Sequence, residues 1–545
     1  MKSKLALAAI VVLPVLMNCS APSRGTSSTG GTTSAAGNSG AGGSSVGSGG
    51  SGEAGGSGST VSSGGATQLG GATAEGGSVA SGGVGNVGGK GAAGGTVTSG
   101  GVSGSGGAPA SGGATGAGGA PASGGAPGAG GAKGTGGTAG AAGTGPQGPC
   151  DIYQAANTPC AGAHSTVRAL YASYTGALYQ VLRASDKTTK DILVGSGGYA
   201  DTSVQDSFCS GTTCTIPIIY DQSPNGNHLR VTWFSHWLPT GGIPANATGA
   251  KITIAGHTVY GIKTAGGFGT TTNVAYRTGT PLSGTAAVTK GSTTVTFSTP
   301  QTLPANSPLM FVAAVASCGT YSCPMSYTAT DINAATTVTL KTAYDGPSAA
   351  TTVTWNQATK AVVTGDNPEA MYSVFDAKNT NAYCCFDYGN AEQDGVDDGA
   401  ATMEALYFGS STQFQKGGAG SGPWMGADIE NGMFECDTPD SVCTTNTSIT
   451  GMSYVTGMLK GPSGNTMVLK AGNAQSGKLE TKWNGKRPAG YSPMKKGGAI
   501  ILASGGDGST AGTGTWFEGA ITVGLPTDAT DDAVQANVVA AGYGK

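Results

Sequence analysis

The amino-acid sequence predicts an all-β protein, an antiparallel β-sandwich, preceded by a long segment that has no core. After residue 150, short runs of alternating apolar and polar residues are separated by Gly, Asn, Asp and Pro, which is the pattern of half-buried strands joined by turns. These runs do not alternate with helical patterns, as the βαβ units of a parallel sheet would require. Half of the 100 glycines lie in residues 21–150, where there is no Phe, Tyr or Trp. That segment cannot bury a core, so the folded part is expected in residues 150–545.

The first 19 residues have the features of an export signal. Lys2 and Lys4 precede an apolar run from Leu5 to Leu16 that is too short to span a bilayer. The run ends in Leu-Met-Asn-Cys, which resembles the lipobox of bacterial lipoproteins, in which the cysteine, here Cys19, becomes acylated. We therefore expect residues 1–19 to be a lipoprotein-type signal peptide and the protein to be extracellular, anchored at the cell surface by lipid on Cys19. The alternative is an ordinary signal peptide that is cut elsewhere.

Residues 20–149 repeat Gly/Ser/Ala/Thr-rich units such as GGAPASGG. Glycine at this density favours the unfolded chain, so the segment is expected to be a disordered, flexible linker. A coil of this length reaches about 60 Å on average. Such a reach suits a tether that holds a folded domain away from a surface.

Within the folded part, the alternating runs predict strands at residues 215–220, 251–263, 293–298, 336–342, 371–375, 405–408, 467–470 and 499–502. Two helices are expected, one at residues 165–174 and one at the C-terminus. In the second helix Thr530 is the expected N-cap, and Asp531 and Asp532 fall in the first turn. The helices are expected to decorate the sandwich and not to define it.

The eleven cysteines fit an exported chain that is stabilised by disulfides. If Cys19 carries lipid, ten remain, and eight of these form four local pairs: Cys150 with Cys160, Cys209 with Cys214, Cys318 with Cys323, and Cys436 with Cys443. The other two, Cys384 and Cys385, are adjacent, about 3.8 Å apart at Cα, which is closer than in most disulfides. If the local pairs hold, these two bond to each other or stay free; otherwise each pairs with a distant cysteine.

Charge and spacing exclude several kinds of partner. The net charge is −3 and no Lys/Arg cluster occurs, so binding to nucleic acid or to an anionic membrane surface is not expected. No run of 18 or more apolar residues is present, which excludes a membrane-spanning helix. The histidines are scattered and no CxxC spacing occurs, so zinc is not expected. Asp394, Asp397 and Asp398 offer oxygens to calcium, but such a cluster in a glycine-containing loop is usually solvated. No metal or cofactor is expected.

Carboxylates beside glycines and aromatic residues remain, and these are the residues from which sugar-cleaving sites are built. In Asp428-Ile429-Glu430, the two acids emerge on one face if the segment is a strand, and Trp424 lies just upstream. Asp507 stands in SGGDGST after the apolar run 499–502, where glycines let the backbone approach a ligand closely. Each acid is equally compatible with a turn or with a surface ion pair.

Six strings carry a resemblance to a known family, in this order along the chain: PCDIYQAANTPCAGAHSTVRALY, DSFCSGTTC, IIYDQSPNGNHL, AYCCFDYGNAE, PWMGADIENGMF and AIILASGGDGS. Together they resemble the catalytic domain of α-L-arabinofuranosidase B, glycoside hydrolase family 54, over residues 150–279 and 363–545. The resemblance implies a concanavalin-like β-sandwich. It also implies retaining hydrolysis that releases terminal α-L-arabinofuranosyl groups from arabinan or arabinoxylan side chains, so an arabinose-containing plant cell-wall polysaccharide or oligosaccharide is the expected partner.

The resemblance further implies roles for single residues. The nucleophile of the family falls on Glu430 and its acid/base on Asp507. Adjacent cysteines of the family form a disulfide that lines the sugar pocket, which matches Cys384 and Cys385. The other expected sugar contacts are Asp428, Asn431 and Gly506, with Trp424 or nearby aromatic residues completing the wall.

The sequence also departs from the family pattern. A pocket tryptophan aligns with Phe414, which keeps a ring but loses the indole N–H donor, and an asparagine that follows Asn431 aligns with Gly432. Both changes motivate an alternative function, a non-catalytic arabinan-binding surface lectin. Residues 280–362 interrupt the resemblance; because they are rich in Thr and Val and alternate, we expect a small inserted β-rich domain within the catalytic domain.

Overall fold

The computed structural model describes residues 146–545 apart from 268–271, 319–320, 331 and 381. The expected signal peptide, the acylated Cys19 and the linker up to residue 145 lie outside the described residues. The side chains of Cys318 and Cys323 also lie outside them, so the structure does not test that predicted disulfide. No helix among the described residues is long and apolar enough to cross a membrane.

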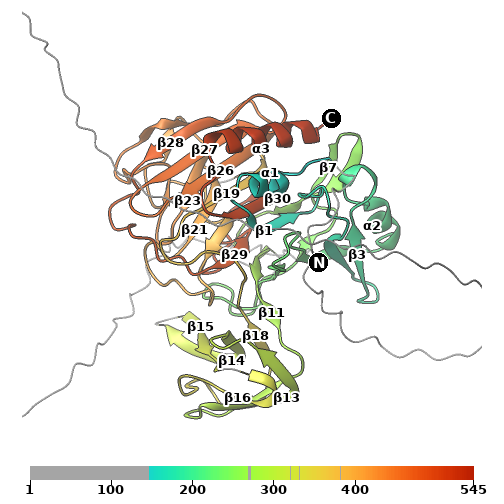
Figure 1. Ribbon diagram of the computed structural model, residues 1–545, viewed down its shortest axis with the longest axis vertical. Helices are drawn as coiled ribbons and strands as arrows, with labels where there is room; N and C mark the ends of the chain where they lie inside the picture. The colour runs from blue at the N-terminus through green and yellow to red at the C-terminus, as the bar shows by residue number, and fades with distance from the viewer. Residues whose placement is uncertain (1–145, 268–271, 319–320, 331, 381) are drawn as a thin grey trace, which may run out of the picture. The chain divides into compact units, whose positions relative to one another are not determined.

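Two large antiparallel sheets dominate the described residues and confirm the predicted β-sandwich (Figure 1). The first sheet runs in the order β1 (Cys160–Ser165), β30 (Gly514–Val523), β19 (Glu369–Asp376), β26 (Tyr454–Gly461), β27 (Met467–Asn473) and β28 (Glu480–Gly485), with β9 (Ile262–Thr264) beside β30. The second runs in the order β24 (Met433–Phe434), β23 (Trp424–Asp428), β21 (Glu404–Gly409), β20 (Asp387–Ala391), β29 (Ala499–Leu502), β10 (Tyr276–Thr278), β5 (Leu229–Val231), β4 (Cys214–Ile219), β2 (Ala177–Arg183) and β3 (Thr189–Leu193), with β6 (Ala245–Asn246) beside β4.

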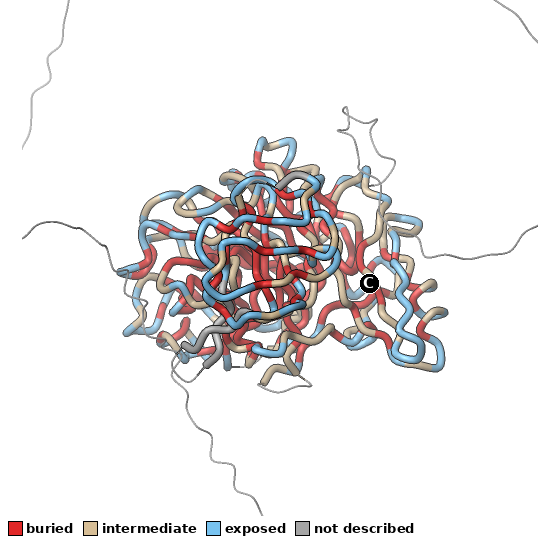
Figure 2. The backbone as a smooth tube through the Cα atoms, turned by 90° about the horizontal axis from the view of Figure 1, so that it is seen from below, coloured by how far each residue is buried: buried red, intermediate tan, exposed pale blue. Residues whose placement is uncertain are grey.

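Aromatic side chains fill the space between the two sheets. The rings of Phe375 on β19 and Phe408 on β21 have centroids 5.8 Å apart, and those of Tyr388 on β20 and Trp516 on β30 are 5.6 Å apart. Such pairs bury a large apolar area and fix how the sheets face each other. Buried residues accordingly concentrate in the inner strands (Figure 2).

Helices cover the outer face of the first sheet. Tyr153 of α1 (Pro149–Ala155) packs against Tyr372 of β19 with ring centroids 6.2 Å apart. Helix α3 (Asp528–Ala541) lies across β26 and β27 (Figure 1), and its Asp531 pairs with Lys460 and Lys470 of those strands. Because this face is covered too, β19 is buried along almost its whole length and does not show the alternation of a half-exposed strand.

The C-terminal helix was predicted, but its cap lies three residues earlier than expected. The hydroxyl of Thr527 is the N-cap and accepts a hydrogen bond from the N–H of Thr530, the residue predicted to be the cap. Gly542 ends the helix in the left-handed conformation, with φ of 80°. Between these two ends, the apolar side chains of α3, among them Val534 and Val538, are buried in the main hydrophobic core.

The helix predicted at residues 165–174 is wrong. Ser165 ends strand β1, and its hydroxyl accepts hydrogen bonds from the N–H groups of Val167 and Arg168, as an N-cap would, but no helix follows. The guanidinium of Arg168 instead pairs with the buried carboxylate of Glu518 on β30. The other helices of the described chain are α2 (Thr202–Phe208) and the short 3-10 helix Ser196–Gly198.

The run 251–263 forms three strands, β7 (Lys251–Ile254), β8 (His257–Tyr260) and β9, where one was predicted. Ala255 and Gly256 connect β7 to β8 with φ of 46° and 81°. Two consecutive residues with positive φ make the tight hairpin turn that favours the twist of the flanking strands. The chain then continues into β9 beside β30.

Residues 280–356 form two further four-stranded sheets with a core of their own. One contains β11 (Thr280–Pro281), β18 (Thr354–Asn356), β14 (Pro308–Cys318) and β15 (Tyr321–Thr328); the other contains β16 (Ile332–Thr339), β13 (Thr294–Leu303), β12 (Ala286–Val288) and β17 (Ala349–Thr352). Phe311, Tyr327 and Tyr344 meet in that core with ring centroids 5.2–5.7 Å apart. The chain enters and leaves this segment through β11 and β18, which are paired neighbours. A two-stranded parallel ladder of β22 (Gly418–Ala419) and β25 (Cys443–Thr447) completes the described strands.

Two of the predicted local disulfides are formed, Cys150–Cys160 and Cys209–Cys214. The predicted Cys436–Cys443 disulfide is not: both cysteines are free and buried. A hydrogen bond from Cys443 stabilises the thiolate form of Cys436, which lowers the pKa of Cys436 to about 6. Threonine hydroxyls lie beside both sulfurs, Thr438 beside Cys436 and Thr445 beside Cys443. The two thiols are therefore hydrogen-bonding neighbours that are not covalently joined.

Candidate active site

Segments that are far apart in the sequence meet beside the second sheet. They are the residues just before β20, the turn between β23 and β24, and the loop after β29. The Oγ of Ser509, in the loop after β29, lies 3.3 Å from the Sγ of Cys385, which precedes β20. A Cβ built on Gly506 in the same loop would lie 2.9 Å from Oε2 of Glu430. Glu430, Asp507 and the two cysteines thus belong to one site.

Glu430 occupies a tight turn and not the strand that the alternation suggested. Strand β23 ends at Asp428, and the N–H of Ile429 donates to the carbonyl of Gly432 to close the turn into β24. Glu430 and Asn431 both have left-handed backbones, with φ of 61° and 56°. Non-glycine residues seldom adopt this conformation, and when they do they concentrate at functional sites. The main-chain N–H of Glu430 donates to Oδ1 of Asp428 at 3.2 Å, which ties the turn to the end of β23.

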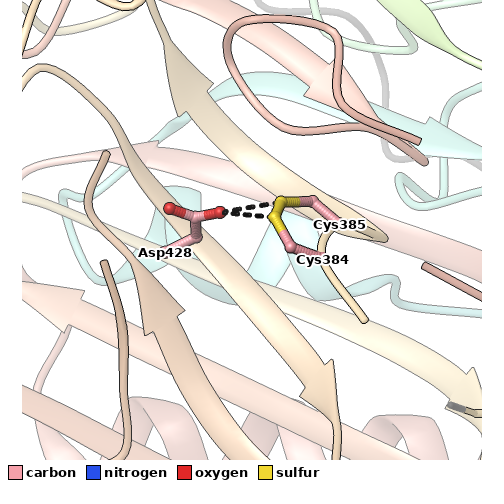
Figure 3. Close-up of side chains that lie close together, drawn as sticks. All are labelled: Cys384, Cys385 and Asp428. Atoms are coloured by element: carbon pink, nitrogen blue, oxygen red, sulfur yellow. Dashed lines mark hydrogen bonds between the residues drawn. A yellow bond between two sulfur atoms is a disulfide. The ribbon is translucent and has the colours of Figure 1, made fainter. Parts of the chain in front are cut away.

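Cys384 and Cys385 are bonded to each other, which resolves the pairing that their sequence left open. Oδ2 of Asp428 faces this disulfide and lies 3.9 Å from Sγ of Cys384 and 3.3 Å from Sγ of Cys385 (Figure 3). These three residues are also within the reach of one metal ion, with their potential ligand atoms within 4.8 Å of one another. A disulfide offers no thiolate, however, so the group is a poor metal site.

Three hydrogen bonds hold Asp507, two to its carboxyl oxygens and one to its main-chain carbonyl. Its Oδ1 accepts the N–H of Ser509 at 2.9 Å, and its Oδ2 accepts the indole N–H of Trp237 at 2.6 Å. The main-chain N–H of Trp237 also donates to the carbonyl of Asp507. Trp237 was not predicted, and the sequence holds no signal for it, because the residue lies in an irregular loop 270 residues away.

Arg277 and Glu392 lie buried next to the acids of the site and were also missed. The guanidinium of Arg277, on the buried strand β10, donates to the main-chain carbonyls of Glu392 and Gly506 and so ties two of the site's segments together. A charged residue between Tyr276 and Thr278 in a fully buried strand is a signal that sequence reasoning could have used. Glu392 is the last residue of the string AYCCFDYGNAE, which carries part of the family resemblance, but nothing in the sequence indicated that it lies beside the two acids.

The site concentrates negative charge under low solvent exposure. Burial raises the pKa of Glu430 well above its ordinary value, and Glu392, Asp507 and Asp428 raise it further whenever they are ionised. Burial also raises the pKa of Asp428 to about 7. The pKa of the fully buried Asp387 is raised as well, by burial first and then by the charge of Asp428. These carboxyls therefore cannot all be ionised together at neutral pH.

The remaining predicted contacts divide into two groups. Phe414 packs against the disulfide, and Asn431 lies beside Glu430 with its Nδ2 donating to Asp397 at 2.9 Å. Whether Trp424 lines the pocket stays a prediction. It begins β23, about 13 Å along the strand from Asp428, and its indole donates to the carbonyl of Ala419.

Gly432 leaves no room for the amide that the family pattern has there. A Cβ at this position would lie within 2.2 Å of the ring of Phe434 and 2.8 Å from the hydroxyl of Tyr491. The Tyr491 hydroxyl donates to the carbonyl of Asn431 at 2.7 Å. The space of the missing side chain is therefore occupied by rings that also brace the turn of Glu430.

Comparison with known proteins identifies the family of this chain. The family model described as "Alpha-L-arabinofuranosidase B, catalytic" matches residues 149–299 and 301–544. The chain belongs to this family. The match breaks only at residue 300, inside the segment 280–362 that the six strings leave out.

Relatives of the arabinofuranosidase B family match most of the chain. A probable α-L-arabinofuranosidase B of Aspergillus fumigatus is 40% identical over 411 residues, and the α-L-arabinofuranosidase B of Aspergillus oryzae is 39% identical; each match covers 73% of this chain. The match spans 62% of the length of these relatives. A crystal structure of an arabinofuranosidase complexed with arabinofuranosyl-α-1,2-xylobiose is similar with a TM-score of 0.55 and 37% identity, over 73% of this chain and 66% of that one.

Proposed function

We propose that the protein is a retaining glycoside hydrolase that releases terminal α-L-arabinofuranosyl groups by double displacement, with Glu430 as nucleophile and Asp507 as acid/base. The observation that carries the proposal is the convergence of these two acids, 77 residues apart in sequence, beside one disulfide-lined wall. A left-handed backbone at Glu430 and the donors on both oxygens of Asp507 support it. Family membership supports the reaction class.

In the first step, the ionised carboxylate of Glu430 attacks the anomeric carbon of the furanose. The bond from that carbon to the leaving-group oxygen breaks, and the proton of Asp507 moves to the departing oxygen. The product is a glycosyl-enzyme ester on Glu430 and a free alcohol. Trp237 and Ser509 would keep the Asp507 carboxyl in a fixed orientation during the proton transfer.

In the second step, Asp507 is ionised and takes a proton from water. The water oxygen attacks the anomeric carbon, and the ester bond to Glu430 breaks. Two displacements at the same carbon restore its original configuration. The buried disulfide and Phe414 would offer the ring an apolar face, while Asp428 and the residues around Asn431 and Gly506 would contact its hydroxyls.

The substrate we propose is an arabinose-containing plant cell-wall polysaccharide or oligosaccharide, an arabinan or an arabinoxylan. The crystal structure of a related arabinofuranosidase in complex with arabinofuranosyl-α-1,2-xylobiose supports this class. We further propose that the enzyme is exported and held at the cell surface by lipid on Cys19, with residues 20–149 as the tether. The segment 280–362 is proposed as an inserted domain, supported by the separate core of residues 286–344.

The test uses an aryl α-L-arabinofuranoside as substrate. The wild-type protein should hydrolyse it, and NMR should show the α-anomer of arabinose as the first product. Glu430→Gln should lower kcat by more than about a thousandfold, because a neutral amide cannot attack. Glu435→Gln, which changes another buried acid outside the site, is the matched control and should keep its activity. Undiminished turnover by Glu430→Gln would end the assignment, and sugar binding without any wild-type turnover would favour the lectin.

A further inference from the structure

Glu392 is a third buried acid beside the two proposed catalytic ones. It follows β20, is 1% exposed, and its Oε2 has no hydrogen-bond partner within the described part of the chain. A Cβ built on Gly506 would lie 2.1 Å from this Oε2 and 2.9 Å from Oε2 of Glu430. The two carboxyl oxygens are therefore at most about 5 Å apart. An acid this close to a nucleophile affects it through its charge.

The hydrogen bonds of Thr402 reveal where a proton lies. The Thr402 hydroxyl is 2.6 Å from the carbonyl of Gly399 and 2.5 Å from Oε1 of Glu392. A hydroxyl has one proton to donate, and a carbonyl oxygen can only accept. One proton cannot serve both acceptors: if Glu392 is ionised, Thr402 satisfies only one of them, whereas a protonated Glu392 can donate to Thr402 while Thr402 donates to Gly399. The neutral acid form of Glu392 is therefore the form in which both contacts of Thr402 are hydrogen bonds.

Among the residues that the structure describes, no salt bridge reaches the carboxyl group of Glu392, although the charge of Arg277 acts on it. Arg277, which is also buried, donates to the main-chain carbonyls of Glu392 and Gly506, and these bonds do not reach the carboxyl group. The other titratable groups that face Glu392 and Arg277 are acids, namely Glu430, Asp394 and Asp507. Burial raises the pKa of Glu392 to about 8, although the Thr402 hydrogen bond and the charge of Arg277 each lower it.

We propose that Glu392 is a positioning residue, held as a neutral carboxylic acid by Thr402, that lets Glu430 alone carry the negative charge at the nucleophile position. The inference rests on the proposed function and deepens it. If Glu392 were ionised, its repulsion at about 5 Å would raise the proton affinity of Glu430 about a few-hundredfold at an effective dielectric constant near 20. The nucleophile would then be protonated and inactive. Neutral Glu392 fills the same space without that penalty.

The first test is Glu392→Gln in the full chain, because glutamine is neutral, has the same shape and can donate its N–H to Thr402. We expect kcat/KM on the aryl arabinofuranoside to stay within about threefold of wild type. The acid limb of the pH profile, which reports ionisation of the nucleophile, should not move. Glu392→Ala, which loses the donor and leaves a space beside Glu430, should lower kcat about tenfold with less change in KM. A loss of more than about thirtyfold in Glu392→Gln, or a shift of its acid limb to lower pH, would overturn the proposal.

A second measurement does not depend on turnover. The infrared difference spectrum between wild type and Glu392→Gln at pH 6 should contain the stretching band of a protonated carboxyl group. A carboxylate band in its place would show that Glu392 is ionised and would refute the inference. If the wild type hydrolyses no arabinofuranoside, the proposed function fails while this spectrum still decides the protonation of Glu392.

Discussion

Replacing Gly506 with alanine tests how tightly the two glutamates converge. The added methyl carbon would lie 2.1 Å from Oε2 of Glu392 and 2.9 Å from Oε2 of Glu430. Ordinary contacts begin at about 3.4 Å, so Glu392 must move by more than about 1 Å and Glu430 by about 0.5 Å. Misplacement of about 1 Å costs up to about a hundredfold in rate, and overpacking of this kind costs about 1–3 kcal/mol of stability.

The assay compares kcat on the aryl arabinofuranoside with the melting temperature of the same sample. We expect Gly506→Ala to lose about a hundredfold in kcat while it still unfolds cooperatively a few degrees below wild type. Gly249→Ala is the matched control, because its new methyl carbon would approach other atoms no closer than 3.3 Å and the residue lies outside the site. Full activity in Gly506→Ala would refute the claim that both carboxyl groups crowd this glycine.

Two further predictions concern Trp237 and Glu435. Trp237→Phe keeps a ring but removes the N–H that donates to Oδ2 of Asp507. A hydrogen bond to a charged group contributes about 1.5–3 kcal/mol, so kcat/KM should fall about tenfold to a hundredfold on aryl substrates with poor leaving groups. An unchanged kcat/KM would contradict a role for the indole. Burial raises the pKa of the Glu435 carboxyl to about 8. Between about pH 4.5 and pH 8 the folded protein therefore keeps a proton on Glu435 that the unfolded chain has released. The stability that this proton confers is lost as the pH rises towards 8. Glu435→Gln should therefore melt at the wild-type temperature at pH 5 and a few degrees above it at pH 8; an equal difference at both pH values would show that the proton is not the cause.

The predicted strand bounds were most accurate where an apolar run of strand length is both flanked by turn residues and buried in the fold. The run AIIL between glycines gives β29 its observed bounds, 499–502, because an apolar run with breakers on both sides has few alternatives. The helix at 165–174 failed because Ser165 makes the hydrogen bonds of a helix cap without a helix. What holds this segment is the ion pair of Arg168 with Glu518, 350 residues away, which no local pattern reports.

The acids of the proposed site were named from the sequence, whereas the residues that hold them in place were not. Glu430, Asp507 and the disulfide were available from motifs, since each lies in a string that carries the family resemblance. Trp237 and Arg277 act through contacts made only after the sheets assemble, so their spacing along the chain carries no signal. The predicted Cys436–Cys443 pair shows the opposite error, because short spacing alone does not make two thiols bond.

The pairing of β11 with β18 has a consequence for how this protein can change. Thr280 lies opposite Asn356, so the two ends of the intervening stretch sit side by side at one edge of a ladder. A short hairpin turn could bridge the same gap, and so could an unrelated module of any size, without moving the strands on either side. The turn at Glu430 allows no such freedom, because Asp428 pairs with Met433 and one added residue would rotate the carboxylate away. Length variation among homologues should therefore gather at the first position and be absent from the second.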